Sequence, residues 1–169
     1  MKYFKQLKEY TCGVACFRMV LSAQGLPDVE DDTLEVLMDT TYESGTHYDA
    51  MVAAADKFGM DCLSGQNATL ESVDKLTQEG WTVVLAYSVD VPHYALYTKH
   101  TDSHVILCDP HFGEKIAFEK AKFERHTWAV EVSRYQAAIA DLRLELDKSL
   151  DTKCWFVAYK KKHENILHT

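Results

Sequence analysis

Hydrophobic residues between positions 12 and 24 fall on nearly every face of a helix rather than on one stripe. Thr11 precedes the segment and is a residue type that caps helix starts, whereas Gly25, with Pro27 beyond it, is typical of a helix end. A helix that is apolar almost all round is normally buried by its neighbours. The pattern therefore predicts a central, buried helix over residues 12–24.

Three further helices are predicted before residue 80, each with a polar residue or a glycine at one boundary. The first is capped by Asp31 or Asp32 and carries Leu34, Val36, Leu37 and Met38. The second is capped by Thr46 and ends before Gly59, and the third covers about 70–78 and ends at Gly80.

The pattern changes after residue 80 to short runs rich in β-branched and aromatic side chains, which are typical of strands. These runs are 81–87, 93–98 and 104–108, followed by a helix at about 135–148 and a last strand at 155–159. The second and third runs are separated by a polar stretch of hairpin-loop length, so they are expected to pair antiparallel. The fold class is α+β, with helices first and an antiparallel sheet afterwards.

The composition fits one globular domain of 169 residues, with 47% hydrophobic content. Eighteen basic residues against 26 acidic ones give a net charge of −8, and a chain without clustered cations is a poor partner for nucleic acid. No apolar run is long enough to span a membrane, and residues 1–9 lack the apolar stretch of a signal peptide. We therefore expect a cytoplasmic protein.

Five cysteines, an odd number, are spread through a chain large enough to fold without covalent staples. They are Cys12, Cys16, Cys62, Cys108 and Cys154. A disulfide framework is therefore not expected, which leaves core packing, metal ligation or nucleophilic chemistry.

Cys12 stands at the first turn of the predicted central helix, where a nucleophilic thiol is physically favoured. Free N–H groups and the positive end of the helix dipole at this position favour the thiolate, which is the attacking species. Gly13 carries no side chain, so a substrate could approach the sulfur closely. Taken alone, Cys12 is better interpreted as a small buried hydrophobe, as Cys16 is, and a catalytic interpretation requires partners.

His93 and Asp109 are the candidate partners. If the hairpin loop is centred on Thr101, these two residues face each other across neighbouring strands, where a carboxylate can fix the tautomer and orientation of an imidazole. Pro110 ends the second strand, which places the pair at the end of the strands, where a substrate could reach it.

Gln6 is a fourth candidate, six residues before Cys12. Its side-chain amide, together with the backbone N–H of Cys12, could stabilise the oxyanion that develops during acyl transfer. Without Cys12 it would be read as an ordinary surface residue.

Three stretches together resemble the papain-like bacteriocin-processing cysteine peptidases, which cleave double-glycine leaders and are often fused to exporting ABC transporters. They are QLKEYTCGVACFRMVL from Gln6, VPHYAL from Val91, and VILCDPHFG from Val105. Lys122, Phe123 and Trp128, and the segment from Gly45 to Gly59, resemble further parts of the family. The likeness covers roughly residues 3–130.

This resemblance implies a papain-like fold with Cys12 as nucleophile, His93 as general base, Asp109 as the residue that orients it, and Gln6 in the oxyanion hole. It implies a single peptidase domain over 1–169, with a core at about 3–130 and a C-terminal helix and strand elaboration at about 131–160. It also implies a peptide or small amide substrate, and a separate transporter or biosynthetic enzyme as partner. Two features depart from the family: Thr11 stands where Asp is common, and the stretch from about 131 to 150 matches no motif.

Three alternatives remain open. The same residues could transfer the acyl group to an amine instead of water, giving an acyl- or amide-transferring enzyme. A non-catalytic peptide-binding module on the same fold would be expected to lack the cysteine, the histidine or the aspartate, and all three are present. A metal site would need convergent ligands, and the nearest set, His100, His104, Cys108 and His111, is split between a loop and both strand faces. No cofactor and no metal are therefore expected.

Overall fold

The computed structural model describes residues 1–89, 91–128 and 154–163. The helix expected at about 135–148 lies outside the described residues, as does most of the expected C-terminal elaboration.

Helices and strands are less cleanly separated along the chain than the sequence suggests, because one strand already lies between the third and fourth helices. The helices are α1 (Cys12–Ala23), α2 (Asp31–Leu37), α3 (Tyr48–Lys57), α4 (Leu70–Gln78) and α5 (Lys120–Lys122), which runs into the π-helical turn η1 (Phe123–Thr127). The strands are β1 (Met60–Gly65), β2 (Thr82–Val89), β3 (Val91–His100), β4 (His104–Asp109), β5 (Gly113–Glu119) and β6 (Phe156–Lys161).

These strands form one antiparallel sheet with the order β1-β6-β2-β3-β4-β5. Both edge strands, β1 and β5, were missed by the sequence analysis. Their side chains are mostly exposed or half-buried, so they lack the hydrophobic signal that marks the interior strands. The α+β prediction and the antiparallel pairing of β3 with β4 are confirmed.

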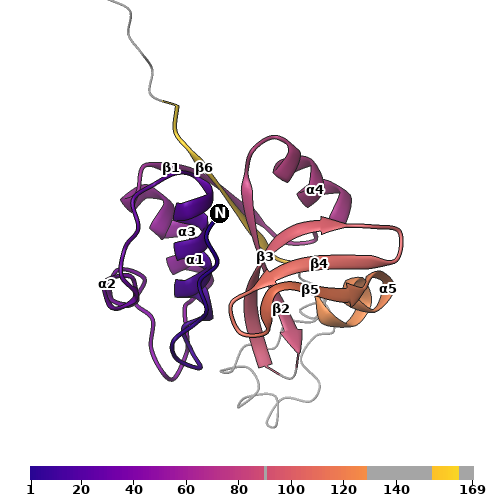
Figure 1. Cartoon of the computed structure of the whole chain (residues 1–169), viewed down its shortest axis with the longest axis horizontal. Helices are drawn as coiled ribbons and strands as arrows, with labels where there is room; N and C mark the ends of the chain where they lie inside the picture. Colours follow the sequence, from indigo (N-terminus) through magenta and orange to yellow (C-terminus); the bar gives the residue numbers. More distant parts are fainter. Residues whose placement is uncertain (90, 129–153, 164–169) are drawn as a thin grey trace, which may run out of the picture.

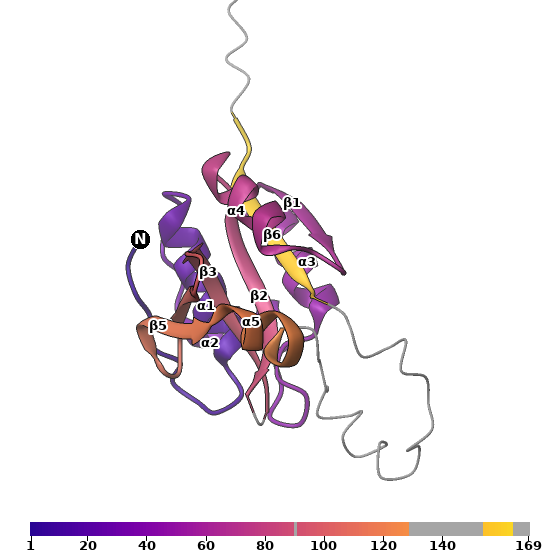
Figure 2. The same ribbon diagram turned by 90° about the vertical axis from the view of Figure 1, so that its right-hand side faces the viewer.

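The sheet separates two hydrophobic cores. One face packs on α1 and α3 around Phe17 and Met51, and the other packs under α4 and η1 around Tyr87 and Phe123. Figure 1 shows α1, α2 and α3 together on one side of the molecule, and Figure 2 shows α4 and α5 on the opposite side of the strands. Successive residues of β3 therefore alternate between the two cores, because side chains of a strand point to opposite faces.

The predicted central helix is present almost as expected: α1 spans Cys12–Ala23, and nine of its twelve residues are buried. Gly25 adopts a φ of 66°, the left-handed conformation that ends a helix at little cost for glycine. The fourth helix is also confirmed, and Thr69 forms a capping box with Ser72 at its start.

The other predicted caps are wrong. Thr11 precedes α1 but makes no capping hydrogen bond, because its hydroxyl is bonded to the backbone of Lys8. Asp31 is already inside α2, where it is buried and paired with Arg18. Thr46 lies before the N-cap of α3 and bonds to Thr40. In each case the side chain that was expected to cap a helix binds another residue instead.

The hairpin register also differs from the prediction. The tip of the hairpin is closed between Thr101 and His104, and an irregularity between Tyr97 and Lys99 shifts the pairing, so Leu96 faces Cys108. Continuing that register by one residue places Asp109 level with Ala95. His93 is therefore a diagonal neighbour of Asp109, two residues along the strand. A shift of two keeps both side chains on one face of the sheet.

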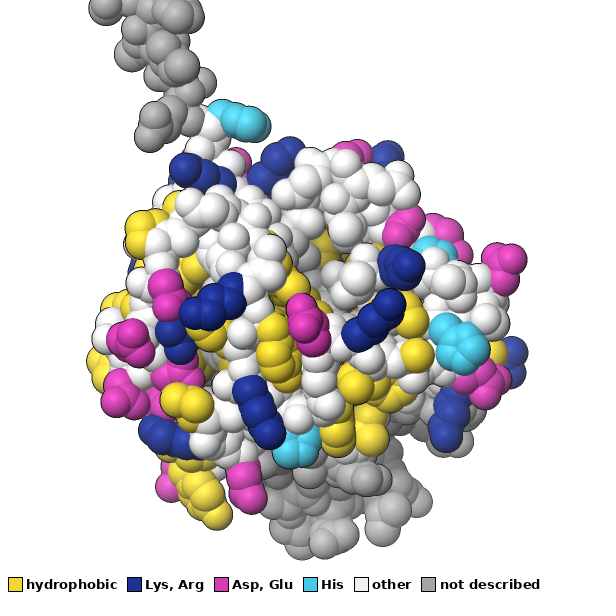
Figure 3. Space-filling view, viewed as in Figure 1, with side chains coloured by type: hydrophobic (Ala, Val, Ile, Leu, Met, Phe, Trp, Pro, Cys, Tyr) yellow, Lys and Arg dark blue, Asp and Glu magenta, His cyan; other side chains and the backbone are white. Residues whose placement is uncertain are grey.

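In the part of the chain that the structure describes, no helix is long and apolar enough to cross a membrane. The face shown in Figure 3 carries hydrophobic side chains in the seam between the helical part and the strands, with charged side chains around it.

Candidate active site

Cys12 is the first residue of α1, and its side chain is 8% exposed. The first amides of a helix have no acceptor within the helix, so they present positive charge where the sulfur lies. Cys16, one turn further along, is completely buried, and burial raises the pKa of its thiol well above the usual value. The five cysteines are all free thiols, and only Cys12 combines a helix N-terminus with a path to solvent.

Gly13 has a packing role that the sequence analysis did not anticipate. A Cβ at this position would lie 2.7 Å from the Thr46 Oγ1 atom and 2.8 Å from the Thr46 Cβ atom. The backbone carbonyl of Thr46 also accepts a hydrogen bond of 2.8 Å from the Tyr94 hydroxyl. The missing side chain thus lets the segment before α3 pack directly against the residue that follows Cys12.

His93 and Asp109 are in direct contact although they are not level in the register. The Nε2 atom of His93 lies 2.9 Å from the Oδ1 atom of Asp109. Both side chains are buried, Asp109 completely. In Figure 1 the turn between β4 and β5, where Asp109 lies, is directed toward the helical part of the molecule.

The Asp109 carboxylate accepts more hydrogen bonds than the one from His93. Oδ1 also accepts the backbone N–H groups of His111 at 2.7 Å and Phe112 at 2.8 Å, and Oδ2 accepts the hydroxyl of Tyr87. Burial by itself would raise the pKa of Asp109, but the hydrogen bonds from His93, Tyr87 and Phe112 outweigh it and lower the pKa below its usual value. The carboxylate is therefore held in the ionised form.

Tyr87 is the residue that the sequence analysis missed. It is fully buried in β2, directly across from His93, and the two rings meet edge to face with centroids 5.5 Å apart. Pairing the predicted runs 81–87 and 93–98 as a symmetric antiparallel hairpin would have placed it opposite His93, as the register shows. The contact with Asp109 across two strands is a tertiary feature that no local pattern displays.

His93 has its pKa raised to about 9, well above the usual 6.5 for histidine. Burial lowers the pKa, but the hydrogen bond to Asp109 and the neighbouring Cys12 thiol both raise it and together outweigh the effect of burial. Because Asp109 occupies Nε2, Nδ1 is the ring nitrogen left for Cys12. The imidazolium form of His93 is therefore favoured at neutral pH.

Gln6 is buried beside these residues but is engaged differently from the prediction. Its Nε2 atom donates to the carbonyls of Lys8 at 2.9 Å and Glu9 at 3.2 Å, whereas its Oε1 atom is buried and has no partner among the described residues. Its backbone N–H donates to Pro110, 2.9 Å away. Gln6 thus lies between the approach to α1 and the residue that follows Asp109.

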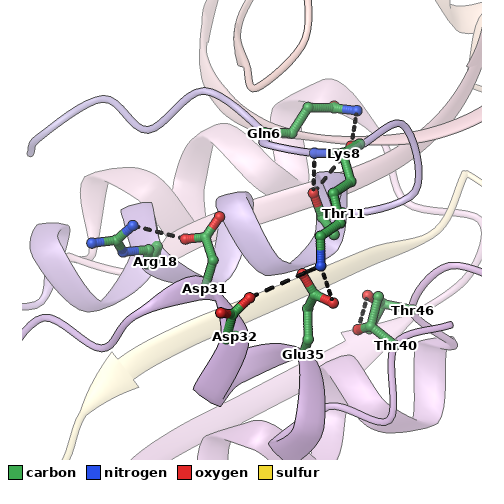
Figure 4. Close-up of polar contacts among 9 residues, drawn as sticks. All are labelled: Gln6, Lys8, Thr11, Arg18, Asp31, Asp32, Glu35, Thr40 and Thr46. Atoms are coloured by element: carbon green, nitrogen blue, oxygen red, sulfur yellow. Dashed lines mark hydrogen bonds and ion pairs between the residues drawn. The ribbon is translucent and has the colours of Figure 1, made fainter. Parts of the chain in front are cut away.

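The segment before Cys12 is anchored on two sides. Figure 4 shows Lys8 bonded to Glu35 of α2, with the Lys8 Nζ to Glu35 Oε1 distance at 2.7 Å, and Thr11 and Gln6 gathered around the same lysine. On the other side the hydroxyl of Tyr3 donates to the backbone carbonyl of Asp109 at 2.8 Å. These contacts join the helix that carries the thiol to the strand that carries the carboxylate.

The residues considered as metal ligands are used elsewhere. His100 contacts Tyr97, His104 contacts Ser103, and the thiol of Cys108 is directed toward Met19 in the α1 core. Within residues 1–89, 91–128 and 154–163, no three histidine, cysteine, aspartate or glutamate side chains are arranged to hold a metal ion.

Comparison with protein families gives a match to the peptidase C39 family over residues 1–133. No curated protein matches the sequence significantly.

Solved structures resemble the chain over almost its whole length at low sequence identity. A C39-like peptidase from Bacillus anthracis has a TM-score of 0.66 at 14% identity, covering 96% of each chain. The peptidase domain of Streptococcus ComA, a bifunctional ABC transporter of a quorum-sensing pathway, has a TM-score of 0.65 at 19% identity, covering 95% of this chain and all of that one. A double-glycine motif protease from an AMS/PCAT transporter, solved with its leader peptide, has a TM-score of 0.64 at 13% identity, covering 95% and 91%. The architecture is thus that of a C39 peptidase domain.

Proposed function

Because the chain belongs to the peptidase C39 family and is a cysteine peptidase-like hydrolase, we propose that it cleaves a peptide bond with Cys12 as nucleophile and His93 and Asp109 as its catalytic partners. The observation that carries this assignment is the hydrogen bond of 2.9 Å between His93 and Asp109, together with the Cys12 thiol that raises the pKa of the same imidazole. A thiol, a base and an orienting carboxylate in this order are the elements of nucleophilic acyl transfer.

In the first step the Cys12 thiolate attacks the carbonyl carbon of the scissile bond. His93, protonated at neutral pH, then donates its proton to the departing amine as the C–N bond breaks and its electrons pass to nitrogen. A thioester on Cys12 and a free amine result. Water, deprotonated by the now neutral His93, attacks the thioester carbonyl. The C–S bond then breaks, the acyl part leaves as a carboxylic acid, and the Cys12 thiolate and the protonated His93 are regenerated.

The negative charge on the carbonyl oxygen needs donors at the start of α1. The backbone N–H of Cys12 is one candidate, and the side-chain amide of Gln6 is the second. Both hydrogens of that amide already have carbonyl acceptors, of which Glu9 is the more distant at 3.2 Å. Gln6 would therefore exchange the bond to Glu9 for one to the oxyanion as the substrate binds.

A peptide with two glycines before the scissile bond is the proposed substrate class. The support comes from the AMS/PCAT neighbour, a double-glycine motif protease that was solved with a leader peptide. A cytoplasmic location and a separate transporter or biosynthetic enzyme as partner go with this peptide-processing role.

The test is to incubate the chain with a synthetic peptide that contains an internal Gly-Gly and to identify the products by mass. We expect cleavage after the second glycine, with the N-terminal fragment trapped as an acyl group on Cys12 after acid quenching. Adding a simple amine, glycinamide, separates the two reaction types, because a transferase joins it to the fragment in preference to water. If no Gly-Gly peptide leaves an acyl group on Cys12, the proposal is contradicted.

A further inference from the structure

Phe112 is a large apolar side chain left in solvent next to a buried histidine. It lies in the turn between β4 and β5, and 52% of its surface is exposed. Its ring centroid is 6.0 Å from that of His93, with the rings at 67°, whereas His93 is only 9% exposed. Phe112 therefore offers exposed apolar surface directly beside His93.

The position of this ring is fixed by the same carboxylate that orients His93. Asp109 Oδ1 accepts the backbone N–H of Phe112 at 2.8 Å and of His111 at 2.7 Å, besides its contact with His93. The ring of His111 packs edge to face on Phe112, with centroids 4.7 Å apart. Phe112 is thus a rigidly placed apolar surface, in contrast to a side chain at the tip of a free loop.

The side of the site on which Phe112 lies follows from the chemistry. His93 must stand next to the nitrogen of the departing amine to give it a proton, so residues that flank His93 meet the part of the substrate after the scissile bond. Resting on the proposed function, we infer that Phe112 binds the side chain of the first residue after the scissile bond and selects an apolar one. Burying an apolar side chain against an exposed aromatic ring removes both surfaces from water.

The experiment uses the full chain and peptides that share one acyl part ending in Gly-Gly and differ in the next residue, which is Leu, Phe, Ala or Asp. We expect kcat/KM to be about tenfold higher for Leu and Phe than for Ala and Asp, within the range that apolar subsites provide. Phe112→Ala should reduce this preference to within about twofold, and Phe112→Lys should shift it toward Asp. Leu63→Ala is the matched control, since Leu63 is 45% exposed on the opposite edge strand, and it should keep the wild-type preference.

A Gly-Gly methyl ester distinguishes the failure of this inference from the failure of the proposed function, because its leaving group carries no side chain. If neither the ester nor any peptide acylates Cys12, the proposed function fails. If the ester is turned over and the four peptides are cleaved alike, only the assignment of Phe112 is overturned. An equal loss for every peptide and for the ester in Phe112→Ala would also overturn it, since Phe112 would then merely position His93.

Discussion

Two clusters of tyrosine, aspartate and histidine lie along strand β3, one toward each end, and β3 contributes the histidine of each. The first consists of Tyr87, Asp109 and His93, and the second of Tyr97, Asp74 and His100. In the first cluster both Tyr87 and His93 bond directly to the carboxylate. In the second, the Tyr97 hydroxyl donates to Asp74 at 2.9 Å and lies 2.7 Å from the His100 Nδ1 atom, so it stands between the carboxylate and the imidazole.

Their surroundings differ more than their composition. Asp109 is completely buried and accepts four hydrogen bonds, whereas Asp74 lies half-buried on α4, where its second oxygen accepts the side chain of Gln78. Cys12, at the N-terminus of α1, adjoins His93, whereas His100 lies at the other end of β3. We therefore expect a reactive histidine only in the first cluster, where the carboxylate is buried and a thiol lies beside the imidazole.

Replacing Cys12 should have the largest effect. We expect Cys12→Ala to abolish peptide cleavage and the fast reaction with iodoacetamide at about pH 7, because no other thiol lies beside an imidazolium. Cys62→Ala is the control: burial raises the pKa of Cys62 to about 11, so its loss should change neither measurement. Mass spectrometry of the labelled chain gives the site, and rapid labelling of another cysteine would refute the assignment of the nucleophile.

Asp109→Asn should lower kcat/KM by about 100-fold or more, the scale of general acid–base catalysis. The pKa of His93 should fall from about 9 when the carboxylate is lost, so the decline of activity on the alkaline side should begin at lower pH. Asp74→Asn, in the second cluster, should leave kcat/KM within about twofold. The measurement is a pH–rate profile of the wild type and of both variants. Equal profiles for the two variants would contradict the proposed difference between the clusters.

Tyr87→Phe should act mainly on stability. Removing the hydroxyl leaves the buried Oδ2 of Asp109 without its donor, at a cost of about 1–3 kcal/mol in the free energy of unfolding. The lowered pKa of Asp109 contributes stability that is fully present above the ordinary pKa of 3.8 and is lost as the pH falls through the lowered pKa. Without the Tyr87 donor the pKa of Asp109 in the folded chain should lie closer to 3.8, so this acid-dependent loss should be smaller in the variant and complete at higher pH. Denaturant titrations at several acidic pH values check this, with Tyr97→Phe as the variant expected to lose less, since water can replace the donor to Asp74.

The smallest effect concerns alkaline pH. His93 gains protons on folding, so its contribution to stability is complete below the unfolded pKa of about 6.5 and is lost as the pH rises through about 9. The free energy of unfolding should therefore fall over that interval in the wild type, and His93→Gln should flatten the fall. In His100→Gln the free energy of unfolding should fall with pH as it does in the wild type. If this variant flattens the fall instead, the titrating histidine belongs to the second cluster and the prediction is wrong.

Features that depend on neighbouring residues along the chain could be predicted. The bounds of α1 follow from a nearly continuous apolar run that ends at the left-handed Gly25, and the end of α4 follows from Gly80. Strands β2, β3, β4 and β6 were found because their interior positions are filled with apolar side chains. The placement of Cys12 at a helix start came from the same local reasoning.

Features that depend on distant partners could not. Asp31 was expected to cap a helix, but Arg18, thirteen residues earlier, takes it into a buried ion pair. The register of β3 and β4 was wrong by two residues because the hairpin tip and the shift after Tyr97 are set by hydrogen bonding between strands. Local patterns carry no information about such contacts, since the competing partners are equally polar.

The sequence by itself thus determined the fold class and the residue types that could perform acyl transfer, because helix and strand periodicity and the chemistry of a thiol at a helix start are local properties. Only the tertiary structure decided that His93 meets Asp109 diagonally, that Tyr87 donates to the same carboxylate, and that Phe112 is fixed beside them. The physical reason is that one buried charge must collect enough donors to remain ionised, and those donors come from strands β2 and β3 and from the β4–β5 turn, brought together only by folding.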